Sequence, residues 1–446
     1  MEMLLGKYWA SAASVAVLWG AVPVSADTGE IAAAVEQDYA NHLEALFVHF
    51  HENPELSFLE TNTARRMAAE LRSTGMEVTE NVGGTGVVGM VRNGPGPLVM
   101  LRADMDGLPL PEKSGLPYAS SAVQVAQDGA EYPVMHACGH DVHITSMVGT
   151  ARQLMAMKDQ WSGTLMFVVQ PAEERVGGAE LMLKDGLYER FGKPDYALAF
   201  HVDADIPTGK VSGSEGIVGS SADSVDIVVP GIGAHGASPH QGRDPVYIGA
   251  QIVTALQSID SREIGPLTPV VVTVGAFHSG TKHNIISDEA RLQLTVRAND
   301  EEIRAQTHAA IERIAVNIGR AHGLPEDLLP RVTRTEGTPV TANDSALARR
   351  LNAVMIDAFG EDGFEPAVQT GMGAEDFAYF VTKEQGVPGY YFAVGGTPPE
   401  DFEAAANGGP PVPSHHSPLF KIAPKESVTL GTQAMIAAVL DLAPAP

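Results

Sequence analysis

The sequence predicts an α/β fold, in which a mostly parallel sheet is interrupted by a smaller α+β domain. Strands and helices alternate along the first part of the chain, which is the order of an α/β protein. Short continuous apolar runs there are typical of parallel strands buried on both faces. The middle of the chain changes to a βαββα order, the pattern of a ferredoxin-like domain. Since 446 residues are many for one core, two domains are expected.

The larger domain is expected to begin over residues 27–219. Apolar residues at helix spacing predict a helix from residue 27 to about residue 51, and HENPELSFLE then indicates a turn before a second helix. The later elements are strands at 87–91 and 98–103, a helix at 144–157, and strands at 164–169 and 196–201. The last two strands end at QPAEE and at a histidine, and open α/β sheets bind ligands at such strand ends.

The middle of the chain is expected to form an inserted domain over residues 220–336. Leu292, Leu294 and Val296 alternate with polar residues, which is typical of a strand with one buried face. The expected elements are strands at 224–229, 270–276, 289–298 and 331–335, and helices at 244–262 and 301–322. The larger domain then resumes over residues 337–446, with a helix at 345–359, a strand at 389–394 and a loop at 403–413.

Composition restricts the partners of the protein. A hydrophobic content of 44% with 19% charged residues is ordinary for a soluble globular protein and excludes a disordered one. The formal net charge of −26 argues against a nucleic-acid partner, because phosphate binding needs a basic surface.

Residues 1–26 have the features of a cleaved signal peptide. Lys7 precedes an apolar run of small residues, and Val24-Ser25-Ala26 fits a small-residue cleavage signal. A single membrane anchor is the alternative. However, a glycine and a proline interrupt the run, which is barely long enough to span a bilayer. We therefore expect export to a periplasm or out of the cell.

Three short segments end in groups that bind divalent metals: Cys138 and His140 in HACGHDVH, Glu173–Glu174 in QPAEE, and His415–His416 in PSHHSPLF. A thiolate, imidazoles and a carboxylate form a borderline-soft ligand set suited to zinc or a similar ion. An isolated cysteine is better interpreted as a buried inert thiol. The histidine two residues after Cys138, the only cysteine in the chain, reverses that preference. The pattern predicts a metal-activated water that attacks an amide.

Other polar residues flank these segments. Gly139 can adopt the backbone turn that lets both ligands of HACGHDVH converge. Asp104 and Asp106 lie on the same side of an extended segment, where one could orient a ligand imidazole or approach a metal; a solvated strand-end pair is the alternative. Asp141 and His143 could support the site in the same way, or be a helix N-cap and a surface histidine.

The adjacent Glu173 and Glu174 are the candidates for the chemical step. Two carboxylates at a strand end repel each other unless a metal neutralises one of them. Glu174 would then bind metal, while Glu173 would hold the attacking water as general base and protonate the leaving nitrogen. Spacing alone leaves the two roles open, and a solvated surface pair is the ordinary interpretation of two adjacent glutamates.

The motifs together, in their order along the chain, resemble those of a known family. They are HENPELSF, LRADMDGLPL, HACGHDVH, QPAEE, GAHGASPHQGRDP, GAEDFAYF and HSPLF. They look like the hippurate-hydrolase and auxin-conjugate-hydrolase branch of the aminoacylase–carboxypeptidase metallopeptidase family. The resemblance covers essentially the whole chain after the predicted signal peptide. It implies a catalytic α/β domain interrupted by a smaller lid, a binuclear metal centre, and removal of an acyl group from N-acylated amino acids.

Matched residue by residue, the resemblance implies a role for each motif. The implied metal ligands are Cys138, His140, Glu174, His201 and His416, with His415 as the alternative to His416. Glu173 matches the general base, and His235 matches a lid histidine that reaches the scissile carbonyl. Asn284 and Arg297 match positions that hold the substrate, Arg297 being suited to a carboxylate. An ordinary strand arginine is the alternative for Arg297.

The resemblance also implies the cofactors and partners. Two divalent ions are expected, zinc or manganese, with nickel or cobalt as alternatives because availability often decides occupancy. The expected partner is a small-molecule substrate, and an edge strand of the lid could pair subunits into a homodimer or tetramer. Two other functions are open: a metallo-exopeptidase (carboxypeptidase or dipeptidase) with the same centre, and a catalytically silent binding or metal-storage protein. A complete set of ligands and base disfavours the second of these.

Overall fold

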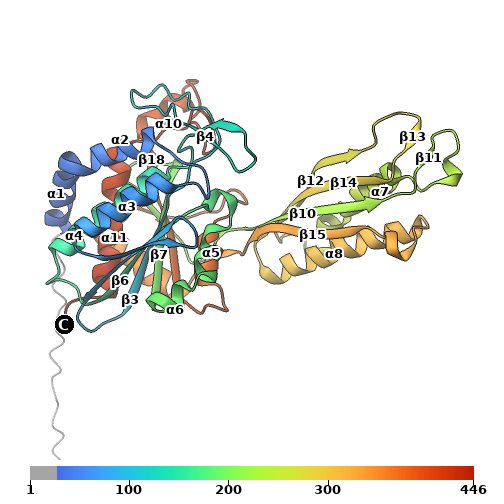
Figure 1. The fold of residues 1–446 in the computed structure, drawn as a ribbon. Helices are drawn as coiled ribbons and strands as arrows, with labels where there is room; N and C mark the ends of the chain where they lie inside the picture. Colours follow the sequence, from blue (N-terminus) through green and yellow to red (C-terminus); the bar gives the residue numbers. More distant parts are fainter. Residues whose placement is uncertain (1–27) are drawn as a thin grey trace, which may run out of the picture.

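The computed structural model describes residues 28–446, so the predicted signal peptide of residues 1–26 lies outside the described residues. Figure 1 shows two parts: a larger domain built on a central sheet, and an elongated lid that projects from one side of it. Within the described part of the chain, no helix combines the length and the apolar character needed to cross a membrane.

Eight strands form the central sheet of the larger domain. β3 (Leu98–Asp104) lies between β6 (Gly163–Gln170) and β7 (Tyr196–Pro207) and runs parallel to both. β18 (Gly389–Thr397) pairs in parallel with β7. The C-terminal ends of these four strands therefore meet at one edge of the sheet. The outer strands are β1 (Glu77–Val82) and β2 (Gly86–Asn93) beyond β6, and β8 (Val211–Gly213) and β17 (Phe364–Pro366) beyond β18.

Helices cover both faces of this sheet, because successive strand residues point to opposite sides. In β3, Val99 and Leu101 belong to one apolar cluster and Met100 to another. The first cluster packs against α1 (Thr28–Asp38), α2 (Glu44–Glu52), α3 (Thr61–Ser73), α4 (His140–Ala156), α9 (Ser345–Phe359) and α11 (Pro424–Leu442). The second packs against α5 (Gly178–Lys184), α6 (Leu187–Phe191) and the 3₁₀ turn η7 (Asp376–Val381).

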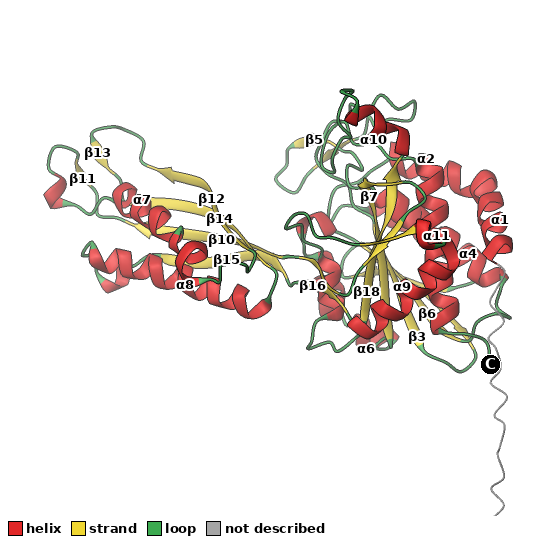
Figure 2. Cartoon of the chain, turned by 180° about the vertical axis from the view of Figure 1, so that it is seen from behind, coloured by secondary structure: helices red, strands yellow, loops and turns green. Residues whose placement is uncertain are grey.

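The lid is an antiparallel sheet of four strands with two helices on one face (Figure 2). Along β14 (Glu289–Ala298), alternate residues such as Leu292 and Leu294 are buried with apolar side chains of α7 (Pro245–Leu256) and α8 (Glu301–Ala321). Both helices begin at an aspartate, Asp244 or Asp300, whose side chain accepts hydrogen bonds from the first turn. The other strands are β10 (Ser221–Pro230) and the two edge strands, β12 (Val270–Ser279) and β15 (Arg331–Thr338).

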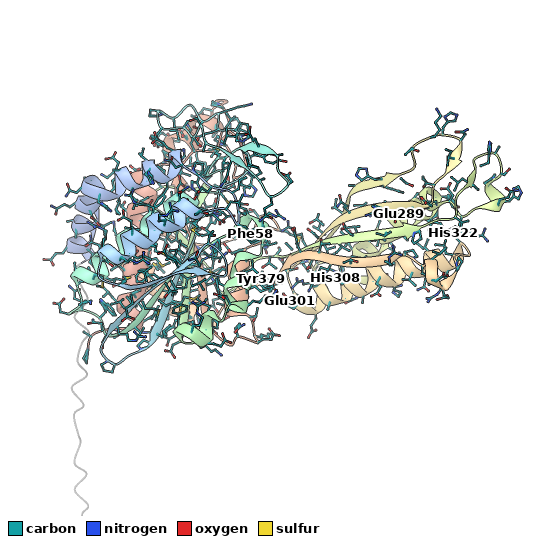
Figure 3. The ribbon with its side chains drawn as sticks, in the orientation of Figure 1. Phe58, Glu289, Glu301, His308, His322 and Tyr379 are labelled. Atoms are coloured by element: carbon teal, nitrogen blue, oxygen red, sulfur yellow. The ribbon has the colours of Figure 1, made fainter. Side chains whose placement is uncertain are left out.

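The chain enters and leaves the lid through one antiparallel ribbon. In this ribbon β9 (Gly216–Gly219), which precedes β10, pairs with β16 (Thr341–Asn343), which follows β15. Nearby, Arg175 of the larger domain and Glu336 of β15 form an ion pair of 2.8 Å. Phe58 and Tyr379 of the larger domain line a cleft of about 370 Å³ at this junction (Figure 3). The two connections are therefore paired with each other, and side chains of the larger domain contact the lid beside them.

The α/β class, with a mostly parallel sheet and a smaller α+β lid, is confirmed, but some details differ from the sequence-based prediction. A π-helical turn, Tyr39–Leu43, divides the helix predicted over residues 27–51. The sequence does not predict the edge strand β1, because most of its residues are polar. The loop predicted over residues 403–413 begins inside a helix, α10 (Pro399–Ala406). Proline and two acidic residues in the first turn, followed by alanines, favour that helix.

Candidate metal centre

The candidate ligands gather at the edge where the parallel strands end. Asp104 is the last residue of β3, and the 3₁₀ turn η2 (Glu173–Arg175) follows β6. His201 lies on β7, and Cys138 and His140 lie at the N-terminus of α4. Because β3 is parallel to both of its neighbours, segments that are distant in the sequence come together at this edge.

A glycine turn brings Cys138 and His140 into place. Gly139 has a φ of 85°, a left-handed conformation that favours glycine. A side chain at this position would also collide with β7, because an added Cβ would lie 2.3 Å from a methyl carbon of Val202. The close approach leaves Cys138 Sγ 3.4 Å from His201 Nε2.

His201 is prepared to act as a neutral nitrogen donor. Its Nδ1 lies 2.6 Å from the Val202 carbonyl oxygen, so Nδ1 carries the proton and Nε2 is left with its lone pair. Burial lowers the pKa of His201 well below its ordinary value, and the neighbouring His143 lowers it further. A metal ligand must be the neutral imidazole, which is the form that this environment favours.

The predicted ligands form overlapping groups, in each of which the donor atoms lie within 4.8 Å of one another. Three of these groups are Cys138, His140 and His201; Cys138, Glu174 and His416; and His140, Glu173 and Glu174. Together they contain the five predicted ligands and the predicted general base. The structure thus brings all six residues together, while their individual roles remain predictions.

Three buried polar atoms of these groups lack hydrogen-bond partners, namely both ring nitrogens of His140 and Glu174 Oε1. Leaving such atoms unpaired costs about 1–3 kcal/mol each. His140 Nε2 lies 4.0 Å from Glu174 Oε1 and 3.9 Å from Glu173 Oε2. These separations are too wide for hydrogen bonds but suit a cation about 2 Å from each donor. The sulfur, nitrogen and oxygen donors therefore fit a divalent metal.

His416, rather than His415, faces the ligand cluster. Nε2 of His416 lies 3.4 Å from Glu174 Oε2. His415 instead accepts a hydrogen bond from the Ala204 backbone N–H at 3.1 Å and packs on the Phe420 ring. The geometry thus favours His416 as the ligand of the two.

The backbone is strained around this cluster. His416 has a φ of 61°, and Ala172 and Val176, which flank η2, have φ values of 51° and 44°. Positive φ is uncommon for residues with a side chain, and Val176 is β-branched as well. Strain of this kind collects at functional sites, where the surrounding structure enforces it.

Asp106 holds two ligand-bearing segments. Its carboxylate accepts hydrogen bonds from the backbone N–H groups of Glu173 and Glu174, each at 3.1 Å. One of its oxygens lies 3.3 Å from His140 Nδ1, and Ser57 donates a hydrogen bond to the other at 2.6 Å. Asp106 therefore fixes η2 and orients the His140 ring without belonging to any of the ligand groups.

Asp104 orients its surroundings through His143. Asp104 Oδ1 lies 2.6 Å from His143 Nδ1, and His143 Nε2 accepts a hydrogen bond from the Val202 backbone N–H at 2.9 Å. Both residues are buried, so neither a solvated strand-end pair nor a surface histidine describes them. Asp104 also lies 3.8 Å from His140 Nε2, close to the ligand cluster.

Sequence reasoning missed a buried ion network behind the cluster. Arg102 of β3 is 1% exposed and donates to Asp104 at 2.7 Å, to Glu375 at 2.8 Å and to Asp376 at 3.2 Å. One signal could have indicated it, namely an arginine inside the otherwise apolar strand LVMLRAD. Arginine is rarely fully buried unless it is paired, so this position predicts buried carboxylates nearby.

The electrostatics of the cluster favour a bound cation. Burial raises the pKa of Glu173 well above its ordinary value, and the charges of Glu375 and Glu174 raise it further. Burial also raises the pKa of the Cys138 thiol, with Glu174 and Glu173 adding to the effect. Groups of this kind ionise when a cation compensates their charge.

The lid residues His235 and Asn284 lie far from this cluster. His235 belongs to β11 (Ala234–His235), which pairs with β13 (Ile285–Ile286) at the end of the lid that points away from the larger domain (Figure 1). The Gly236 N–H donates to the Asn284 carbonyl at 2.8 Å, so His235 and Asn284 are neighbours, and both are exposed. Arg297 lies near the opposite end of the lid sheet, on β14, where burial lowers its pKa.

Comparison with known proteins agrees with this geometry. The family model described as peptidase family M20/M25/M40 matches residues 100–408. The chain belongs to this family. The family resemblance expected from the motifs is thereby confirmed.

Relatives of this M20-family chain include two named hydrolases. Hippurate hydrolase of Campylobacter jejuni is 38% identical, over 77% of this chain and 86% of its own length. Thermostable carboxypeptidase 2 of Saccharolobus solfataricus is 37% identical, over 77% of this chain and 83% of its own length. The crystal structure of Bacillus subtilis YXEP, described as a dinuclear metal-binding peptidase of family M20, is 27% identical. It covers 91% of this chain and 98% of its own, with a TM-score of 0.71.

Gly139→Ala should weaken metal binding. The left-handed φ and the 2.3 Å approach to Val202 leave no room for a methyl group, so the turn must shift and separate Cys138 from His140. We expect the affinity for Zn²⁺, measured by competition with a chromophoric chelator, to fall by at least about 10-fold.

Gly209→Ala is the matched control for this prediction. Gly209 has a φ of 84°, yet no atom lies within 4 Å of a Cβ added there. Both variants carry the backbone strain of a left-handed alanine, and only Gly139→Ala disturbs the ligand turn. Equal Zn²⁺ affinities in the two variants would contradict the role assigned to Gly139.

Proposed function

We propose that this protein is a metal-dependent amidohydrolase that removes the acyl group from N-acyl amino acids. The observation that supports it most strongly is Glu173, a buried carboxylate beside a complete set of thiol, imidazole and carboxylate donors. A spare base next to metal ligands is what hydrolysis by an activated water requires. The similarity to hippurate hydrolase supports the substrate class, since hippurate is an N-acyl glycine.

The mechanism divides the chemistry between cations and side chains. The residues that would hold the cations are Cys138, His140, Glu174, His201 and His416. Bound divalent ions supply Lewis acidity, which polarises a carbonyl and acidifies a water molecule. Glu173 takes a proton from the attacking water and delivers it to the leaving nitrogen. Asp106 fixes the Glu173 backbone, so the carboxylate is held in position for both transfers.

A metallo-exopeptidase is the second candidate function. The chain is 37% identical to thermostable carboxypeptidase 2 and 38% identical to hippurate hydrolase, so sequence similarity alone does not separate the two activities. The ligand cluster and the base would serve equally well for a peptide bond. The two candidates differ in whether the group on the acyl side of the scissile bond is a simple acyl group or an amino-acid residue.

Zinc or manganese is our proposal for the native ions, with nickel or cobalt as alternatives. The thiolate donor favours zinc, whereas the carboxylates and imidazoles accept any of these ions. We also propose that the protein is exported to a periplasm or out of the cell, which rests on the signal-peptide pattern of residues 1–26.

His235 lies at the end of the lid that points away from the larger domain, which we call the lid tip. It can act on the substrate only when the lid tip approaches the metal ligands of its own chain or of another chain. Closure of the lid over its own site is one route. A homodimer or tetramer formed through the lid is another, in which the tip of one chain reaches the site of a second. The lid edge strand β12 has no further strand beside it in the described structure, so it is available for pairing of this kind.

A substrate screen with metal removal tests the proposed function. We expect Zn²⁺- or Mn²⁺-loaded protein to release free amino acid from hippurate or N-acetyl amino acids. We expect a chelator to abolish this activity and added metal to restore it, because the activated water depends on the cation. Faster cleavage of dipeptides than of every N-acyl amino acid would favour the exopeptidase. Full activity after exhaustive chelation would contradict both candidates.

Glu173→Gln should separate chemistry from metal binding. Glutamine keeps the size of the side chain but cannot accept the proton, so we expect kcat to fall by about 10²–10⁴-fold. Elemental analysis should find the wild-type metal content in this variant. Glu174→Gln is the comparison, and it should lose metal together with activity. Normal turnover by Glu173→Gln would refute the assignment of the base.

His235→Ala should lower kcat by about 10²–10³-fold without loss of metal, because it removes a donor to the developing oxyanion. Steady-state kinetics and elemental analysis check both parts. Mixing His235→Ala with Glu173→Gln protein then distinguishes closure of the lid over its own site from action of the lid tip on a second chain. Activity regained on mixing means that the lid tip acts on the site of another chain, and wild-type kcat in His235→Ala would exclude His235 from the reaction.

A further inference from the structure

A buried histidine outside the ligand cluster contacts two separate segments at once. His51 lies in the last turn of α2, and its side chain is 6% exposed. Its Nδ1 lies 2.7 Å from Asp141 Oδ2, and its Nε2 lies 3.2 Å from Glu112 Oε1. The rings of Tyr118 and Phe47 enclose it, with centroids 5.1 and 5.6 Å away. Each ring nitrogen therefore has its own carboxylate acceptor, and the ring has little freedom to move.

The Nδ1 contact leads to the turn that bears Cys138 and His140. Asp141 is the residue after His140 and is 1% exposed. Its second oxygen, Oδ1, accepts a hydrogen bond from the Val142 backbone N–H at 3.0 Å. The carboxylate is thus held from two sides, and with it the first turn of α4.

The Nε2 contact leads to the segment that bears His416. Glu112 also accepts hydrogen bonds from the Ser114 hydroxyl and, at 2.6 Å, from the Ser120 N–H. The next residue, Lys113, donates its backbone N–H to the Pro418 carbonyl at 2.7 Å. Pro418 lies two residues after His416. A short chain of hydrogen bonds therefore joins His51 to the C-terminal ligand segment.

The charge of the ring suits this position. Burial lowers the pKa of His51, but the hydrogen bonds to Asp141 and Glu112 outweigh it and raise the pKa to about 10. An imidazolium can donate from both nitrogens, and hydrogen bonds between charged groups are the stronger kind. The C-terminal end of α2 also favours a positive charge.

We propose that His51 is a positioning residue for the metal centre, holding the Cys138–His140 turn and the His416 segment in register. The inference rests on the proposed metal-dependent function. Donors from separate segments must all approach a cation to about 2 Å, so a small error in the spacing of two segments lowers the affinity. A purely structural histidine would change the stability of the fold and leave metal affinity unaltered.

The test compares His51→Phe with wild-type protein. Phenylalanine keeps a ring but removes both nitrogens. We expect the Kd for Zn²⁺, measured by chelator competition at a temperature where both metal-free proteins are folded, to rise by about 10–100-fold. We also expect the thiolate-to-metal charge-transfer band of the Co²⁺-loaded protein to shift or weaken, because it reports on Cys138. His51→Gln can donate to one carboxylate only, so its Kd for Zn²⁺ should lie between the values for wild-type protein and His51→Phe.

A variant that breaks a contact of α4 far from its first turn is the control. Asp38 of α1 is 7% exposed and accepts hydrogen bonds from Arg152 of α4 at 2.8–3.0 Å. Asp38→Asn should lower the unfolding midpoint of the metal-free protein, because it weakens the hydrogen bonds that the partly buried Asp38 accepts from Arg152. It should keep the wild-type Zn²⁺ affinity and Co²⁺ spectrum, which separates loss of stability from loss of positioning.

Folded His51→Phe protein with wild-type Zn²⁺ affinity and Co²⁺ spectrum overturns the inference. If that variant does not fold, Asp141→Asn and Glu112→Gln replace it, since each keeps the shape of one partner. Weakened Zn²⁺ binding in either supports the inference, and wild-type affinity in both overturns it. Wild-type protein that binds neither Zn²⁺ nor Co²⁺ contradicts the proposed function itself and the inference with it.

Discussion

The burial of several carboxylates at one edge of the central sheet is the constraint on which the rest of the structure depends. Asp104, Asp106, Glu173, Glu375 and Asp376 are all buried near the ends of β3 and β6. Like charges repel strongly away from water, so such a group is stable only when cations and hydrogen-bond donors compensate it. The buried Arg102 guanidinium of β3 contacts three of these carboxylates, and Ser57 and two backbone N–H groups donate to Asp106. A divalent ion among the sulfur, nitrogen and oxygen donors would compensate Glu173.

This balance of charge determines where the ligand-bearing segments lie. The carboxylates that do the positioning, Asp104 and Asp106, bind the backbone of η2 and the rings of His140 and His143. Polar contacts also hold the strained backbone: Ala172 donates its N–H to Glu60, and His416 donates its N–H to the Ala137 carbonyl, each at 2.9 Å. The geometry of the cluster therefore depends on residues that need not touch a metal themselves.

Much of the fold and the ligand set could be predicted because the information is local. Apolar periodicity identifies strands and helices one at a time, and HACGHDVH and QPAEE place donors at short spacing. The network around Arg102 could not be predicted in this way, since its partner Glu375 is 273 residues away and meets it only through the order of strands in the sheet. Likewise, no local pattern sets the angle of the lid, so the sequence could not show how far His235 stands from the ligand cluster.

The ribbon formed by β9 and β16 bears on how such a protein could change during evolution. Gly219 and Thr341 are partners in this ribbon, so the points at which the insertion starts and finishes are adjacent. A tight loop could join them while every strand of the central sheet and every donor of the cluster stayed where it is. The lid is thus a separable module, and descendants could exchange it while inheriting the ion-binding core intact.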